Sequence, residues 1–114
     1  MSMRALEGEQ WLVRIFLGES DRWQGRPLVD ALLERLRREG FAGATVLRGL
    51  AGFGARSVLH TTHLLELSRD LPLLVEVVDT QEHLQRLESI LDEMMGDGLV
   101  TLEKVRVLRY RAGS

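Results

Sequence analysis

Several stretches of the chain have the hydrophobic pattern of β-strands. In residues 10–17, Trp11, Val13 and Ile15 alternate with Leu12, Arg14 and Phe16, so both faces of this first strand are largely apolar. Further extended segments are expected over 44–50, 63–67, 71–78 and around 104–110. The stretch 73–78 is rich in valine, which is typical of a central strand.

Two segments instead have the three- and four-residue spacing of amphipathic helices. The first begins at Pro27 and ends at Gly40, and its apolar positions are Leu28, Val29, Leu32, Leu33 and Leu36. The second is expected to be capped by Asp79 or Thr80 and to end at 96–98, with Leu84, Leu87, Leu91, Met94 and Met95 buried. The polar segment 18–26 between the first strand and the first helix is interpreted as a loop.

The order of these elements predicts the fold class. Strand, helix, strand, long loop, strand, helix and strand form an α+β, ferredoxin-like βαββαβ sandwich, with two helices on one face of an antiparallel sheet. Such a sheet leaves its other face uncovered, although the first strand is apolar on both faces. We therefore expect oligomerisation to cover the second face.

Composition limits the classes of function. The 114 residues suit one domain, 1–114, with an N-terminal tail over 1–9. A net charge of −2 argues against a nucleic-acid partner, and the absence of cysteine excludes disulfides and sulfur-ligated metal sites. Neither a signal peptide nor a membrane span is evident, so a cytoplasmic location is expected. Fourteen of the fifteen basic residues are arginine, Lys104 being the exception, and arginine binds phosphate or carboxylate through a planar fork.

The most distinctive candidate site is the glycine-rich segment 49–54, which follows the second strand. Closely spaced glycines allow backbone N–H groups to approach a phosphate, with Arg48 and Arg56 supplying charge. The alternative is that these glycines only permit a bent hairpin and a flexible loop. The spacing matches neither a dinucleotide fingerprint nor a Walker loop.

Three other groups could carry chemistry. His60 and His63 favour hydrogen bonding at a loop or strand end over a metal site, since the glutamate of a zinc-peptidase motif is missing. Glu19 and Asp21 share a short loop, but two acids alone do not indicate catalysis. Arg109 belongs to a basic C-terminal edge, which is either solvated or one wall of an anion site between subunits. No catalytic motif, metal site or cofactor is assigned.

Five motifs in order give the chain a family resemblance. They are Gly18 to Leu28 (GESDRWQGRPL), Gly43 to Gly54 (GATVLRGLAGFG), His60-Thr61, Asp70-Leu71-Pro72 and Gly98 to Glu103 (GLVTLE). Over roughly 10–111 the chain resembles the domain of unknown function 190 family, which is similar to the PII nitrogen-regulatory proteins. The resemblance implies a ferredoxin-like homotrimer, a regulatory loop over 49–63 and nucleotide clefts between subunits. It also implies a membrane-transporter partner, because some relatives are encoded beside fluoride exporters.

The sequence therefore favours a non-enzymatic, PII-like signalling protein that binds a small anionic effector or nucleotide between subunits. The predicted ligand-binding residues are Arg48, Gly49, Gly52, Phe53, Gly54, Arg56, His60 and Arg109. One alternative is a small trimeric enzyme that uses Glu19, Asp21 or His60 as acid or base. Another is a metal-tolerance or metal-binding protein of the same fold.

Overall fold

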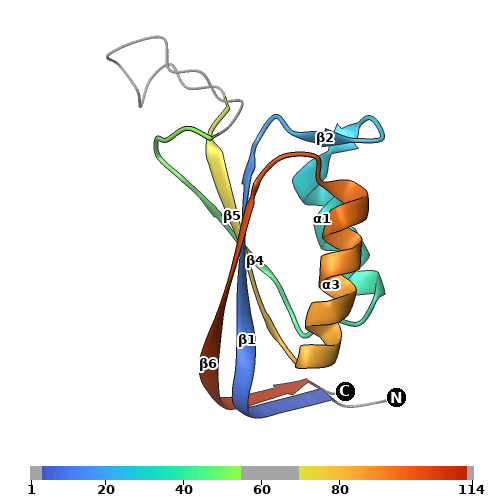
Figure 1. The fold of residues 1–114 in the computed structure, drawn as a ribbon, viewed down its shortest axis with the longest axis vertical. Helices are drawn as coiled ribbons and strands as arrows, with labels where there is room; N and C mark the ends of the chain where they lie inside the picture. The colour runs from blue at the N-terminus through green and yellow to red at the C-terminus, as the bar shows by residue number, and fades with distance from the viewer. Residues whose placement is uncertain (1–3, 55–69, 113–114) are drawn as a thin grey trace.

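The computed structural model describes residues 4–54 and 70–112 and confirms the α+β, ferredoxin-like architecture (Figure 1). Its elements are β1 (Arg4–Gly18), β2 (Arg22–Trp23), β3 (Arg26–Pro27), α1 (Leu28–Arg38), β4 (Thr45–Arg48), β5 (Pro72–Asp79), α3 (Gln81–Met94) and β6 (Leu99–Ala112). Within the described residues, one antiparallel sheet has the strand order β4-β5-β1-β6. Both helices lie on the same side of this sheet (Figure 1). The extended stretch expected over 63–67 lies outside the described residues.

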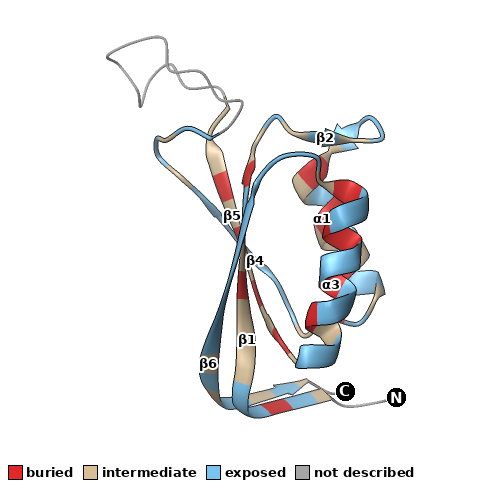
Figure 2. Cartoon of the chain, viewed as in Figure 1, coloured by how far each residue is buried: buried red, intermediate tan, exposed pale blue. Residues whose placement is uncertain are grey.

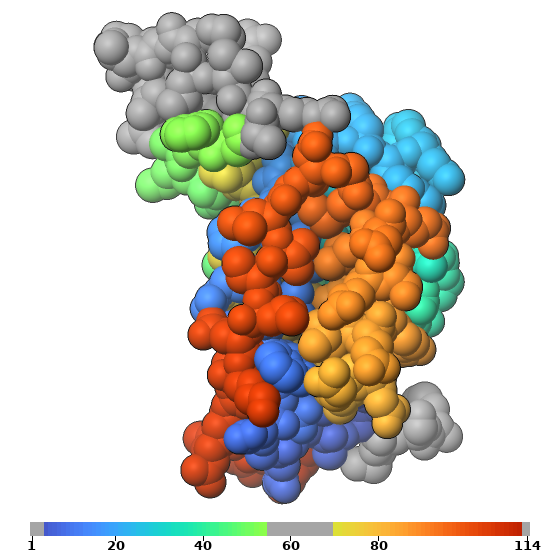
Figure 3. Space-filling model, viewed as in Figure 1, coloured from blue at the N-terminus to red at the C-terminus, as the bar shows by residue number. Residues whose placement is uncertain are grey.

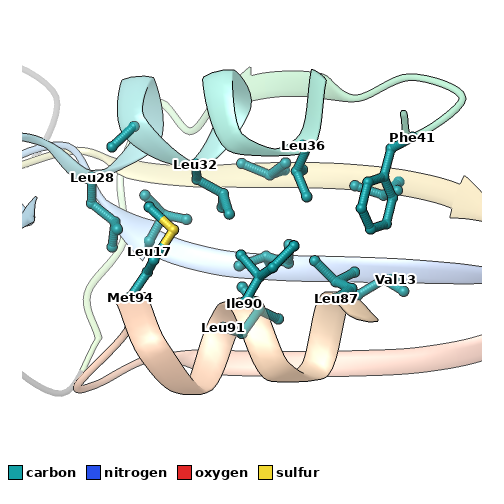
Figure 4. Packing of buried hydrophobic residues seen from close by; sticks show 14 of the residues in the cluster. Val13, Leu17, Leu28, Leu32, Leu36, Phe41, Leu87, Ile90, Leu91 and Met94 are labelled. Atoms are coloured by element: carbon teal, nitrogen blue, oxygen red, sulfur yellow. The ribbon is translucent and has the colours of Figure 1, made fainter. Parts of the chain in front are cut away.

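The hydrophobic core fills the space between the sheet and the two helices. Val13, Ile15 and Leu17 alternate along β1 and are buried, as are Leu73, Val75 and Val77 along β5. The helices supply Leu28, Ala31, Leu32 and Leu36 from α1 and Leu84, Leu87, Ile90, Leu91 and Met94 from α3, which meet over the sheet (Figure 4). The buried stripe runs along the inner side of each helix, and the outer sides are exposed (Figure 2). Since burying one such side chain is worth about 1.5–3 kcal/mol, this layer is the main source of stability.

The helix ends follow the predicted signals. Gly40 has a φ of +80° just after α1, a conformation that glycine adopts without a steric penalty. Thr80 precedes α3, and its side-chain oxygen accepts a hydrogen bond from the His83 backbone N–H at 3.2 Å. Helix α1 begins at Leu28, one residue later than expected, with Pro27 at its N-cap.

The predicted N-terminal tail is wrong for residues 4–9. These residues extend β1 and pair with the end of β6, where Arg4 is opposite Ala112 and Leu6 is opposite Tyr110. The register shifts between Leu6 and Gly8, and the two-stranded ribbon bends there toward the base of α3 (Figure 1). Leu6 is only 3% exposed. The bent ribbon therefore buries an apolar residue that a solvated tail would expose.

A buried carboxylate holds this bent ribbon in place. Asp79 accepts two hydrogen bonds from the Arg4 guanidinium, at 2.7 and 3.0 Å, and two more from the backbone N–H groups of Ala42 and Thr80, both at 2.8 Å. Burial alone would raise the pKa of Asp79, but these four donors outweigh it and hold the pKa below its usual value. The hydroxyl of Tyr110 donates to the Ala42 carbonyl at 2.7 Å. The N-terminus, the loop after α1 and β6 are thus joined at one end of the sheet.

The segment 18–26, expected to be a loop, contains a short hairpin. Strands β2 and β3 pair around Gln24 and Gly25, which both have positive φ values, 49° and 77°. Two consecutive residues with positive φ are the signature of a tight primed hairpin turn. Trp23 packs against the core from this hairpin.

No helix or strand among residues 4–54 and 70–112 covers the second face of the sheet, as the strand patterns predicted. The residues that alternate with the buried ones on β5 and β1 point away from the helices. A row of apolar side chains crosses four strands there, because Leu47 is opposite Leu74, Leu74 opposite Phe16 and Phe16 opposite Leu99. In the next row Arg14 forms ion pairs with Glu76, at 3.0 Å, and with Glu103.

Neither helix in the described part of the chain has the length and apolar character needed to cross a bilayer.

Candidate functional site

Segments far apart in the sequence meet at the end of the sheet opposite the Asp79 cluster. The strand register places Gly18 opposite Pro72, Arg48 opposite Leu73 and Phe16 opposite Leu99. The end of β1, the end of β4, the start of β5 and the start of β6 therefore lie together. In the space-filling view the green, yellow, blue and orange segments gather at this end (Figure 3).

A cavity of about 310 Å³ opens at this junction. It is lined by Phe16, Leu17, Gly18, Asp21, Phe53, Gly54, Asp70, Pro72, Asp97, Gly98 and Leu99. These residues provide apolar walls and three carboxylates, and none of those described as lining it is basic. The cavity therefore suits an apolar or ring-shaped group better than a phosphate, which the carboxylates would repel.

The structure separates the glycines of the 49–54 segment by role. The Gly49 N–H donates to the Pro72 carbonyl at 2.7 Å, which prolongs the pairing of β4 with β5. A Cβ at Gly49 would lie 2.7 Å from Pro72 Cγ, and one at Gly52, where φ is +154°, would lie 3.2 Å from the same atom. Among the described residues, no atom lies within 4 Å of a Cβ placed at Gly54, which lines the cavity. Gly49 and Gly52 thus serve the bend, whereas Phe53 and Gly54 are available to a ligand.

The turn formed by residues 18–21, named here the acidic turn, joins the two sides of the junction. The Gly18 N–H donates to the Asp21 carboxylate, and the Ser20 N–H donates to Asp70 Oδ1, both at 2.9 Å. The Glu19 N–H donates to the Leu71 carbonyl, also at 2.9 Å. A Cβ at Gly18 would lie 2.8 Å from Asp70 Oδ1, so a side chain at this position would require the Asp70 carboxylate to move.

Arg48, a predicted anion ligand, is already paired with Glu19 of the acidic turn. Arg48 Nε donates to Glu19 Oε2 at 2.7 Å, and its second nitrogen donates to Oε1. The hydrogen bond from Arg48 lowers the pKa of Glu19, and the pair likewise raises the pKa of Arg48. Nearby Asp70 opposes the first effect by repelling the Glu19 charge. The Nε and Nη2 edge of the Arg48 guanidinium is therefore occupied by a carboxylate from the same chain.

Comparison with known proteins identifies the family. The family model for domain of unknown function 190 (DUF190, uncharacterized ACR) matches residues 10–107. The chain belongs to the DUF190 family. A UPF0166 protein of Aquifex aeolicus is 39% identical over 99 residues, covering 85% of this chain and 91% of its own. A second UPF0166 protein, from Methanocaldococcus jannaschii, is 31% identical over 99 residues, covering 86% and 91%.

Solved structures extend this DUF190 fold to PII-like signalling proteins. One from Thermus thermophilus has a TM-score of 0.60 and 22% identity, with 95% of this chain and 94% of that chain covered. The nitrogen-regulatory PII-like protein CPII of Thiomonas intermedia, solved bound to ADP and bicarbonate, has a TM-score of 0.56 and 17% identity, with 91% of each chain covered. At these identities the likeness establishes the fold.

Not all predicted site residues of this DUF190 chain come together. Arg56 and His60 lie outside the described residues, as does His63. Arg109 was expected to share an anion site, but within one chain it lies ten residues along β6 from Leu99, about 30 Å of extended strand from the cavity. Across 4–54 and 70–112, histidine and acidic side chains nowhere form a group of three placed to hold a metal ion.

Sequence reasoning missed several residues at the cavity. Phe16, Asp70 and Gly98 line it, yet their patterns indicated only a strand face, a loop and a helix end. Asp70 and Gly98 belong to two of the motifs that carried the family resemblance. Their positions in those motifs were the one signal that could have pointed to the site.

Proposed function

We propose that this DUF190 protein is a non-enzymatic, PII-like signalling protein. It works as a homotrimer, binds a small anionic effector such as a nucleotide in clefts between subunits, and regulates a partner protein, with a membrane transporter as the expected class. The observation that carries this proposal is the cavity that Phe53 and Gly54 line together with residues from three other segments, 16–21, 70–72 and 97–99.

The open face of the sheet supports the intersubunit part of the proposal. Phe16 and Leu99 belong both to the apolar row on that face and to the lining of the cavity. A second subunit that covers the row would therefore also form a wall of the cavity. Arg109, remote from the cavity of its own chain, becomes available to the cavity of a neighbour in such an assembly.

The chemistry of the lining suggests how an anion is oriented. Phe16, Phe53 and Pro72 favour a planar ring, and carboxylates such as Asp21 accept hydrogen bonds from an amine on that ring. The phosphates would then point outward, toward Arg48 or a basic residue of the next subunit. An adenine nucleotide has this polarity, and CPII of the same fold was solved with ADP.

Isothermal titration calorimetry against ATP, ADP, AMP and cyclic AMP tests the proposal. We expect saturable heat with at least one nucleotide, weakened roughly 5-fold by Phe53→Ala through the loss of about 1 kcal/mol of ring contact. Gln85→Ala is the control, because Gln85 is exposed on the outer side of α3, away from both the cavity and Arg109. No heat with any nucleotide at millimolar concentration would remove the nucleotide assignment. A monomer in sedimentation velocity would remove the intersubunit cleft.

A further inference from the structure

Glu19 occupies the place of an anionic ligand at Arg48. Both oxygens of its carboxylate accept hydrogen bonds from the Arg48 guanidinium. A phosphate or a carboxylate of a ligand would present the same pair of oxygens to this planar fork. Ligand and Glu19 therefore cannot both take the Nε and Nη2 donors along this edge of the guanidinium.

The pair is weak enough to be displaced. The Arg48 side chain is 61% exposed and that of Glu19 is 32% exposed. Solvent screens such pairs, and breaking one changes an equilibrium by only about 2- to 5-fold. A phosphate with two negative charges attracts the guanidinium more strongly than one carboxylate does. An effector that carries a phosphate could therefore displace Glu19 from Arg48.

The acidic turn connects this competition to the strands around the cavity. Glu19 and Ser20 are bonded through their backbone N–H groups to Leu71 and Asp70, at the start of β5. The side chain of Glu19 bonds Arg48, at the end of β4. Loss of the Glu19–Arg48 pair therefore separates the turn from β4 and leaves its bonds to the start of β5 in place.

We propose that Glu19 is an internal competitor that sets the affinity of Arg48 for a phosphate- or carboxylate-bearing ligand, so that ligand binding releases the acidic turn from β4. The inference rests on the proposed function for the anionic character of the ligand. It goes further by naming the residue that opposes binding.

Titration with pyrophosphate compares the wild-type protein with Glu19→Gln and Glu34→Gln. Glu34 is the matched control, because it pairs with Arg26 at 2.5 Å on the exposed surface and its replacement changes the net charge equally. We expect Glu19→Gln to bind pyrophosphate about 2- to 5-fold more tightly than Glu34→Gln, as the worth of an exposed pair implies. Adding Arg48→Gln to Glu19→Gln should abolish the gain. Equal affinities of the two glutamine variants, including no binding by either, would overturn the inference.

A second measurement needs no ligand. In the NMR spectrum the Arg48 Nε–Hε resonance should shift in Glu19→Gln and stay in place in Glu34→Gln. An unshifted resonance in Glu19→Gln would overturn the proposed competition, whatever ligand the protein binds.

The proposed function and the inference about Glu19 can fail separately. Tighter pyrophosphate binding by Glu19→Gln together with no nucleotide binding would remove the nucleotide assignment and keep the inference. If the protein binds a nucleotide but Glu19→Gln and Glu34→Gln bind pyrophosphate with equal affinity, the nucleotide assignment stands and the inference about Glu19 is removed.

Discussion

Replacing Arg4 with methionine tests the part of β1 that the sequence pattern assigned to a tail. Methionine keeps much of the apolar stem of Arg4 but removes the guanidinium that donates two hydrogen bonds to Asp79. The Asp79 side chain, only 4% exposed, then keeps the backbone donors of Ala42 and Thr80, and His83 Nδ1 lies 3.3 Å from its Oδ1. The variant therefore removes two of the four hydrogen bonds that this buried carboxylate accepts from Arg4, Ala42 and Thr80.

The expected cost follows from this geometry. Removing one partner of a buried ion pair costs about 3–5 kcal/mol. Here the Arg4 side chain is 27% exposed, and Asp79 keeps two backbone hydrogen bonds, so we expect about 2–3 kcal/mol of lost unfolding free energy. A domain of this size has about 5–15 kcal/mol in total, so the variant should still fold.

Urea unfolding, followed by tryptophan fluorescence at one fixed protein concentration, measures this loss. The matched control is Arg26→Met, which breaks the exposed pair with Glu34 and should cost less than about 1 kcal/mol. If Arg4→Met unfolds at the same urea concentration as Arg26→Met, with the same slope, residues 4–9 do not support the fold as described.

Three further predictions follow from the same structure. Gly49→Ala should lower the unfolding free energy by about 1–3 kcal/mol in urea titrations, because its Cβ would clash with the ring of Pro72. Gly54→Ala is the control and should change the unfolding free energy by less than about 0.5 kcal/mol. Equal losses in the two variants would contradict the separate roles of the two glycines. Folding lowers the pKa of Asp79, so its contribution to stability is present above the unfolded pKa near 3.8 and is lost as the pH falls through the lower folded pKa. The urea midpoint should therefore fall at acid pH, and it should fall less steeply in the Arg4→Met variant. Phe16→Glu, on the open face, should turn the proposed trimer into monomers in sedimentation velocity. Ser89→Glu, on the exposed side of α3, is the control and should leave the trimer intact. A trimeric Phe16→Glu variant would exclude this face as the interface.

The sequence pattern predicted the parts of the fold that depend on local periodicity. The helical stripes of Leu32 and Leu87 and the cap at Thr80 are confirmed, since each is determined by residues within a few positions. The extension of β1 was missed because Gly8 and its glutamate neighbours look polar and irregular in isolation. What stabilises this extension is Asp79, 75 residues from Arg4, and no local window contains both.

The candidate site was predictable only in part, for the same reason. The glycine-rich segment was singled out as a candidate site, and its Phe53 and Gly54 line the cavity. Its two interpretations could not be separated without Pro72, which lies 20 residues beyond Gly52 and limits the room for a side chain at Gly49 and Gly52. Arg48 was predicted to supply charge to an anionic ligand, and that role stays a prediction. The sequence contained no indication that Glu19 already binds it, because that contact depends on the strand order of the sheet.

The interactions at one end of the sheet differ greatly in strength from those at the other end. At one end Arg4 and Asp79 form a largely buried pair with backbone donors around it. At the other end the acidic turn is joined to β4 by the exposed Glu19–Arg48 pair, next to a cavity. Sites that respond to ligands need such low-cost interactions, since a ligand can only shift an equilibrium by its own differential affinity. The stronger Arg4–Asp79 interaction would keep the core intact while contacts at the cavity end change, as the proposed control by an effector requires.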